Sequence, residues 1–202
     1  MSGAEEMQRY VIHGTTARTA NEKVTESGMA ESTDSETDRG RVLRIRKMEP
    51  ADIPSVASLE RDIFSEPWSE TGFADALAQR ENLFLTAFRP DGGVIGYCGL
   101  YTAGDEGEIT HVAVAENCRR QGTAAALLAE LLGWARACGI IRIFLEVRIS
   151  NEAAIRLYEK YGFETCGVRR GFYRRPTEDA LLMSCAVCTQ EDRNEKRRSC
   201  LL

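Results

Sequence analysis

The residues in this chain best suited to proton transfer are a glutamate and a tyrosine in its second half. Glu146 stands in the apolar stretch IFLEV, and Tyr158 follows in a segment whose apolar residues have helical spacing. A carboxylate near the carboxyl end of a parallel strand lies where α/β sheets tend to bind ligands, and it can accept a proton. The alternatives are an ion pair of Glu146 with Arg142 or Arg148, and a hydrogen-bonded core position for Tyr158.

A second candidate is the turn that opens a helix near residue 120. Residues 108–114 alternate as a half-buried strand does, with Thr110, Val112 and Val114 expected on one face. The sequence RRQGTA then starts at Arg119 and leads into apolar residues with helical spacing. The first N–H groups of a helix lack intrahelical partners and lie at the positive end of its dipole, so this turn is suited to pyrophosphate. The alternative is a helix N-terminus whose arginines are solvated.

Hydrophobic periodicity predicts the elements that must position these groups. Strands are expected over residues 42–48, 83–89, 93–101, 108–114, 140–147, 163–169 and 180–187. Helices are expected over residues 53–63, after Ser69, from about 123 to 138, and over 150–161. Residues 90–93 predict a hairpin turn and residues 170–179 a loop, and the strand–helix–strand order predicts that 108–114 and 140–147 pair in parallel. The fold class is therefore α/β, with a central mixed, mostly antiparallel sheet, one parallel strand pair and flanking helices.

The composition divides the chain into three parts. Residues 1–40 hold eight acidic and four basic side chains and few large apolar residues, which predicts a disordered N-terminal extension. A single folded domain is expected over residues 41–187 and a polar C-terminal tail over residues 188–202. Because the extension carries most of the net charge of −5, the domain is nearly neutral, and we expect no direct binding of nucleic acid. No apolar run is long enough to span a membrane, so a cytoplasmic protein is expected.

The seven cysteines of the chain do not suggest a metal site. Their number is odd, and the one CxxC pair, Cys185 with Cys188, has no second pair and no histidine nearby. We therefore expect reduced thiols and no bound metal.

Two motifs in register resemble one protein family. The pattern R-x-x-G-x-A at Arg119 to Ala124, after a strand ending in V-A-V, is similar to the acyl-CoA signature of the GNAT-type N-acetyltransferases. The segment LEVRISNEAAIRLYEKYGFE, residues 145–164, resembles the branch of bacterial ribosomal-protein alanine N-acetyltransferases (RimI type). The resemblance covers about residues 42–185. It implies a GNAT-type domain that transfers acetyl from acetyl-CoA to the N-terminal α-amine of a protein, namely the alanine of ribosomal protein bS18. It also implies association with tRNA-modification proteins.

The resemblance also implies roles for individual residues. Glu146 would accept a proton from the amine, and Tyr158 would donate one to the departing CoA thiolate. Trp68 and Tyr173 would contact the acceptor, although core packing is an equal alternative for Trp68. The loop before the last strand reads GFYR from Gly171, where the branch usually has N-Y-Y-P. The residues expected to bind acetyl-CoA are Val112, Ala113, Val114, Arg119, Arg120, Gln121, Gly122, Thr123, Ala124, Ala125 and Asn151.

Two other functions compete with this interpretation. An α-amine has a pKa of about 7.7–8.0 against about 10.4 for lysine, so one carboxylate suffices to deprotonate an N-terminus. Acetylation of lysine or of a small amine such as a polyamine is the alternative within the enzyme class. A non-catalytic acyl-CoA-binding module is the alternative outside it, but such a chain would be expected to lose Glu146 or Tyr158.

Overall fold

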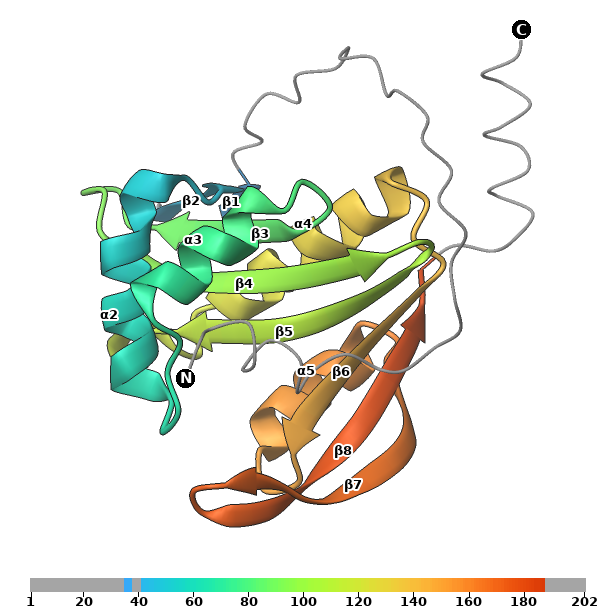
Figure 1. The fold of residues 1–202 in the computed structure, drawn as a ribbon. Coiled ribbons are helices and arrows are strands. Elements are labelled where there is room, and N and C mark those ends of the chain that lie inside the picture. Colours follow the sequence, from blue (N-terminus) through green and yellow to red (C-terminus); the bar gives the residue numbers. More distant parts are fainter. Residues whose placement is uncertain (1–34, 38–40, 188–202) are drawn as a thin grey trace, which may run out of the picture. The chain divides into compact units, whose positions relative to one another are not determined.

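The computed structural model of the chain describes residues 35–37 and 41–187, which form one eight-stranded sheet with the order β1-β2-β3-β4-β5-β6-β8-β7 (Figure 1). Most of the predicted N-terminal extension and the whole predicted tail, residues 188–202, lie outside the described residues. Within the extension, Ser35–Thr37 forms the short edge strand β1, which pairs with β2, so these three residues differ from the expected disorder.

The expected order of strands and helices is confirmed. The remaining strands are β2 (Arg41–Lys47), β3 (Leu83–Phe88), β4 (Val94–Ala103), β5 (Glu106–Val114), β6 (Arg142–Arg148), β7 (Glu164–Arg174) and β8 (Thr177–Ala186). The helices are α2 (Ile53–Ile63), α3 (Glu70–Ala78), α4 (Thr123–Ala137) and α5 (Glu152–Lys160), with short 3₁₀ turns at Pro50–Asp52 and Glu116–Cys118. No helix in the described part of the chain is long and apolar enough to cross a membrane.

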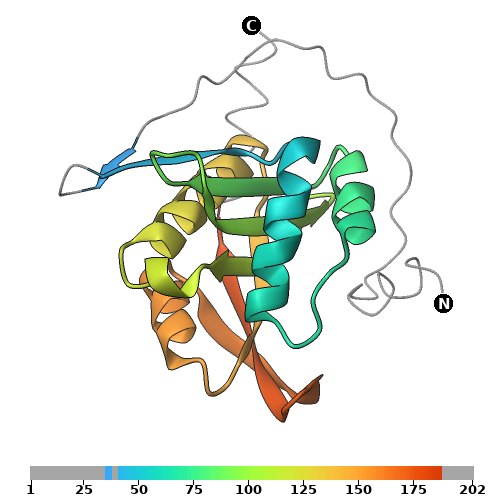
Figure 2. The ribbon, with the colours of Figure 1, turned by 90° about the vertical axis from the view of Figure 1, so that its left-hand side faces the viewer.

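Two helices cover each face of the sheet, as Figure 2 shows. The apolar stripes of α2 and α3 pack on one face around Phe73, Phe84 and Tyr97, and α4 packs on the other with α5. Helix starts agree with the local signals: Ser69 caps α3 by accepting a hydrogen bond from the Gly72 N–H, at 3.1 Å. Asp52 occupies the N-cap position of α2, but its carboxylate does not cap the helix and binds Arg46 and the Glu49 N–H instead.

The parallel pairing of β5 with β6 is shorter than expected. It extends only from Glu106 opposite Arg142 to Ile109 opposite Leu145, and beyond this point the two strands diverge (Figure 1). A register shift against β4 lies at the same place, because Gly99 pairs with His111 while Leu100 pairs with Ile109. Thr110 is therefore an extra, bulged residue, and it does not share a face with Val112 and Val114 as the alternation predicted. The part of β5 beyond the bulge is left without a β6 partner.

The predicted loop over residues 170–179 is wrong, since β7 and β8 continue as a long hairpin. Tyr173 pairs with Glu178 and Arg174 with Thr177, which leaves only two residues in the turn. Between Arg169 and Tyr173 the register shifts, and Gly171 adopts a φ of 59° that favours glycine. This bulge interrupts the alternation of the strand, which is why the sequence reads as a loop.

Candidate active site

Glu146 lies on β6, one residue beyond the last paired position with β5. Its side chain is only 8% exposed, and Oε1 accepts a hydrogen bond from Nη1 of Arg169 at 2.6 Å. Neither Arg142 nor Arg148, the alternative partners expected from sequence, is the partner: Arg148 pairs with Glu178 at 3.0 Å. Because Arg169 keeps 45% of its side chain exposed, its guanidinium lies on the solvent side of the pair.

A second carboxylate, Glu108, was not predicted as a site residue. It lies on β5 opposite Phe144, two residues before Glu146 on the adjacent strand. Burial raises the pKa of Glu108 to about 7, and the charge of Glu146 and a hydrogen bond between the two carboxyl groups act in the same direction. Arg169 opposes this shift. The two carboxyl groups therefore lie beside each other, and the protonated form of Glu108 is favoured.

The raised pKa of Glu108 makes a testable contribution to stability. A carboxyl whose pKa is higher in the folded state stabilises the fold below its unfolded pKa, and this contribution is lost as the pH rises through about 7. Glu108→Gln should therefore gain about 1–3 kcal/mol of unfolding free energy relative to wild type between pH 5 and pH 8. Urea unfolding at several pH values measures this difference. Glu106→Gln, an exposed residue at the start of the same strand, is the control, and a difference for Glu108→Gln that stays constant with pH would contradict the pairing.

Tyr158 is buried on α5, with 7% of its surface exposed, and its ring packs against Phe163. Burial raises the pKa of its hydroxyl far above the usual value, with a smaller contribution from Tyr173. No hydrogen bond of this hydroxyl occurs within residues 41–187, so the predicted alternative of a hydrogen-bonded core tyrosine is not what the structure has. The hydroxyl of Tyr173 donates to the main-chain oxygen of Glu146 at 3.3 Å. Tyr173 therefore lies near both Glu146 and Tyr158.

The turn before α4 has the features expected of an anion site. Gly122 occupies the N-cap with a φ of 86°, and no side chain caps the helix. The first intrahelical bond runs from the Ala126 N–H to the Gly122 oxygen, so the N–H groups of residues 123–125 precede it. Arg120 is exposed and also has a positive φ, of 61°. These residues therefore fit a pyrophosphate, which would take the place of the missing cap.

The side chains of two predicted site residues in this turn form hydrogen bonds to main-chain oxygens of the protein. Arg119 donates from Nε to the Val114 oxygen at 3.1 Å, and Gln121 donates to the Asn117 oxygen at 3.1 Å. Arg119 thus fastens the turn to the end of β5, and Gln121 fastens it to the 3₁₀ turn at Glu116–Cys118.

Two glycines, one at the N-cap of α4 and one inside the helix, provide a matched test of this turn. Gly122→Ala should cost about 1–2 kcal/mol, because its φ of 86° is strained for alanine although the site has space for a methyl group. Gly133→Ala, in the interior of the same helix and equally unobstructed, should instead stabilise by up to about 1 kcal/mol. Urea unfolding of both variants gives the comparison. Equal effects at both positions would show that the turn does not depend on the left-handed conformation.

The main chain of β5 beyond the bulge is positioned to bind a ligand. The Ala115 N–H donates to the Ile95 oxygen of β4. Alternation therefore directs the N–H groups of Val112 and Val114 away from β4, toward the edge where β5 no longer pairs with β6. By the same alternation, the N–H group of Ala113 points toward β4. Asn151, the other predicted cofactor contact, caps α5 by accepting from the Ala154 N–H at 3.2 Å.

Trp68 belongs to an aromatic cluster on the α2 face of the sheet. Its ring lies 4.5 Å from that of His111 and 6.0 Å from that of Tyr101, so the packing alternative for Trp68 is present in the structure. His111 was not predicted as a site residue. Burial lowers its pKa to about 4, its Nδ1 has no hydrogen-bond partner among the described residues, and Nε2 lies 3.6 Å from Glu60, which is fully buried. Its neutral ring therefore contributes shape rather than charge near pH 7.

A cavity of about 390 Å³ lies elsewhere, between α4, the turn that follows α5, and β8. Its lining includes Arg136, Arg142 and Cys185 and none of the predicted site residues. Since Arg142 begins β6 and Glu146 lies near its end, the cavity is separate from the carboxylate pair. Among the residues that the structure describes, no group of three His, Cys, Asp or Glu side chains is arranged to hold a metal ion.

The fold is that of a known class of enzyme. Residues 53–163 match the acetyltransferase (GNAT) family. The chain belongs to this family and is an acetyl-CoA-dependent N-acetyltransferase.

Its relatives include enzymes named for one acceptor. The ribosomal protein bS18-alanine N-acetyltransferase of Escherichia coli K12 is 34% identical over 148 residues, which are 71% of this chain and 97% of that protein. The N-alpha-acetyltransferase RimI of Mycobacterium tuberculosis is 36% identical over 139 residues, 66% of this chain and 85% of that one. The crystal structure of the ribosomal-protein-S18-alanine N-acetyltransferase from Escherichia coli superposes with a TM-score of 0.68 at 31% identity, covering 73% of this chain and 96% of that one.

Proposed function

We propose that this chain acetylates the N-terminal alanine of ribosomal protein bS18, with Glu146 as the proton acceptor and Tyr158 as the proton donor. The observation that carries the mechanism is the nearly buried carboxylate of Glu146, held by Arg169 at 2.6 Å beside Glu108, where β5 and β6 part. The names of the relatives from Escherichia coli and Mycobacterium tuberculosis support N-terminal acetylation, and the former supports bS18 as the acceptor. Association with tRNA-modification proteins, which the resemblance implied, stays a prediction.

Each group of site residues has its own role in the proposed reaction. Acetyl-CoA supplies an activated acetyl thioester, and the uncapped N-terminus of α4 with Arg120 would hold its pyrophosphate. The N–H groups of Val112 and Val114 would hydrogen-bond the pantetheine arm and the thioester oxygen. Glu146, beside Glu108, takes a proton from the acceptor ammonium, which leaves a neutral amine for direct attack. Tyr158, whose hydroxyl forms no hydrogen bond within residues 41–187, donates its proton to sulfur.

Turnover with two peptides tests this proposal. One peptide begins with alanine and has a free amine, and the other has the same sequence with a blocked N-terminus and an added lysine. Acetylation of the free amine alone is the expected result. Acetylation of the blocked peptide would identify a lysine acetyltransferase, and binding of acetyl-CoA without turnover of either peptide would contradict N-terminal acetylation.

A further inference from the structure

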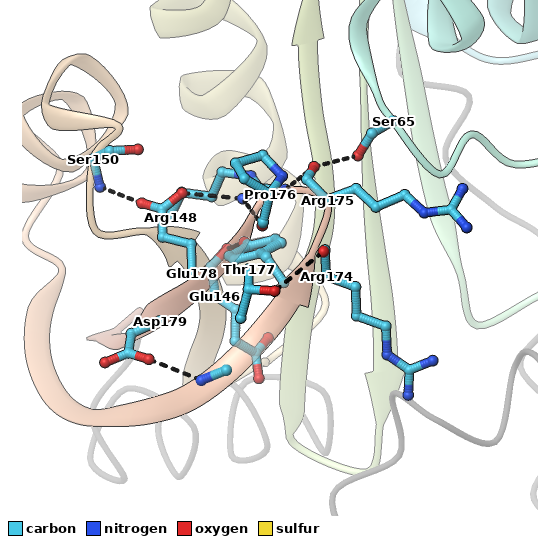
Figure 3. A network of polar contacts seen from close by, with 12 residues as sticks. Ser65, Glu146, Arg148, Ser150, Arg174, Arg175, Pro176, Thr177, Glu178 and Asp179 are labelled. Carbon is cyan, nitrogen blue, oxygen red and sulfur yellow. Dashed lines mark hydrogen bonds and ion pairs between the residues drawn. The ribbon is translucent and has the colours of Figure 1, made fainter.

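Arg148, the last residue of β6, binds the tip of the β7–β8 hairpin through its guanidinium. Nη1 donates to Glu178 Oε2 at 3.0 Å and to the Pro176 oxygen at 3.1 Å, and Nη2 donates to the Arg175 oxygen at 3.1 Å (Figure 3). Its Cζ also lies over the ring of Tyr173, 4.1 Å from the ring centroid. One side chain thus contacts four residues of the hairpin, and only 25% of it is exposed.

These contacts require the shape of an arginine side chain. A guanidinium presents five N–H donors in one plane, whereas a lysine ammonium is a compact charge on a flexible stem. The substitution Arg148→Lys could keep the ion pair with Glu178, but it could not also bond both carbonyl oxygens of the tip and stack on Tyr173. The hydroxyl of Ser65, in the segment between α2 and α3, donates to the Arg175 oxygen as well, at 2.9 Å. The tip is therefore attached to two regions of the domain that are far apart in sequence.

The hairpin that Arg148 holds reaches the proposed proton acceptor. Arg148 and Glu146 lie two residues apart on β6, so their side chains leave the same face of the strand. The hydroxyl of Tyr173, whose ring lies against the Arg148 guanidinium, donates to the Glu146 main-chain oxygen at 3.3 Å. Arg169, on the same hairpin, binds the Glu146 carboxylate at 2.6 Å. Displacement of the hairpin would therefore disturb both the main chain and the side chain of Glu146.

A second branch of this network leads toward the proposed proton donor. The other oxygen of Glu178, Oε1, accepts a hydrogen bond from the Ser150 N–H at 2.7 Å. Ser150 lies in the turn before α5, the helix that carries Tyr158. Arg148 and Glu178 together thus connect the hairpin to the start of that helix.

We propose that Arg148 is a positioning residue for the acceptor, because it holds the hairpin tip and Tyr173 against the strand that carries Glu146. This inference rests on the proposed function, in which the acceptor amine must reach the Glu146 carboxylate. Acetyl-CoA would be held by residues 119–125 and by the N–H groups of β5, whereas these contacts of Arg148 are with the hairpin. Loss of Arg148 should therefore impair the use of the acceptor and leave the binding of acetyl-CoA unchanged.

Steady-state kinetics of Arg148→Gln with the free-amine peptide that begins with alanine test this role. We expect kcat/KM for the peptide to fall by about five- to thirtyfold, because a misplacement of about 1 Å can cost up to about 100-fold. The KM for acetyl-CoA should stay within about twofold of wild type. Arg148→Lys should keep a thermal midpoint close to that of wild type, through its ion pair with Glu178, and should still lose about three- to tenfold in kcat/KM for the peptide.

Two control variants separate positioning from stability. Glu178→Gln removes the ion pair but leaves the carbonyl bonds and the ring contact of Arg148, so kcat/KM should stay within about threefold of wild type. Arg156→Gln removes another arginine that is ion-paired with a glutamate at 3.0 Å, here on the exposed surface of α5, and should keep the wild-type rate.

A double-mutant cycle shows whether Arg148 acts through Tyr173. Tyr173→Phe keeps the ring against the guanidinium and removes the hydroxyl that is bonded to the Glu146 main chain. If Arg148 acts by placing that hydroxyl, the double variant should lose no more in kcat/KM than the more impaired single variant. Losses that multiply would show that the two residues act independently and would contradict the proposal.

Three further results overturn the inference. One is a full kcat/KM for Arg148→Gln, and a second is a loss that appears in the KM for acetyl-CoA instead of in the use of the peptide. A third is full recovery of kcat/KM in Arg148→Lys, which would mean that the ion pair alone is sufficient. Failure of the proposed function gives a different result, since the wild type would then bind acetyl-CoA and leave the free-amine peptide unreacted, and the inference would fail with it.

Discussion

Replacing Glu146 by glutamine is expected to lower kcat/KM by about 10²–10⁴-fold while the affinity for acetyl-CoA stays unchanged. Glutamine keeps the size of the side chain and can still contact Arg169, but it cannot accept a proton. The expected loss therefore lies in the chemical step rather than in binding of the co-substrate. Steady-state kinetics with a free-amine peptide, together with calorimetric titration of acetyl-CoA, measure the two quantities separately.

Two further variants make this prediction specific. Glu159→Gln removes an exposed carboxylate from α5 that is not one of the site residues, and it should retain the wild-type rate. Glu108→Gln removes the other half of the carboxylate pair. If Glu108 rather than Glu146 accepts the proton, the large loss will follow Glu108→Gln, and Glu146→Gln will remain active.

Replacing Tyr158 by phenylalanine should reduce kcat by about 10–100-fold, a smaller effect than that of Glu146→Gln. A thiol has a pKa of about 8.5, so a thiolate leaves without full protonation, and the donor contributes less than the base. The buried hydroxyl has no hydrogen bond in the described part of the chain, and the ring contact with Phe163 is retained in phenylalanine. The thermal midpoint should therefore be unchanged or slightly raised.

Combining rate and stability measurements separates the two possible roles of Tyr158. A full rate for Tyr158→Phe would exclude proton donation by its hydroxyl. A reduced rate together with a lowered midpoint would instead indicate that the hydroxyl supports packing. Only a reduced rate in a protein of wild-type stability supports the donor role.

Much of this protein follows from local sequence signals. The alternation of residues 142–148, the helical spacing before Tyr158 and the cap at Ser69 act over a few residues, so they predicted β6, α5 and the start of α3. The RRQGTA turn followed by apolar residues with helical spacing predicted the opening of α4, and the left-handed conformation of Gly122 at its N-cap is one that glycine adopts without strain.

The tertiary structure alone decided which groups meet at the site. Strand pairing between segments far apart in sequence brings Glu108 next to Glu146 and Arg169 next to both. Hydrophobic periodicity does not predict which strands pair. The bulge at Thr110 and the shifted register after Arg169 each break a period of two, so alternation assigned Thr110 to the wrong face and the β7–β8 hairpin to a loop. Local propensity thus determined the elements of this enzyme, whereas the register between strands determined the partners of its carboxylates.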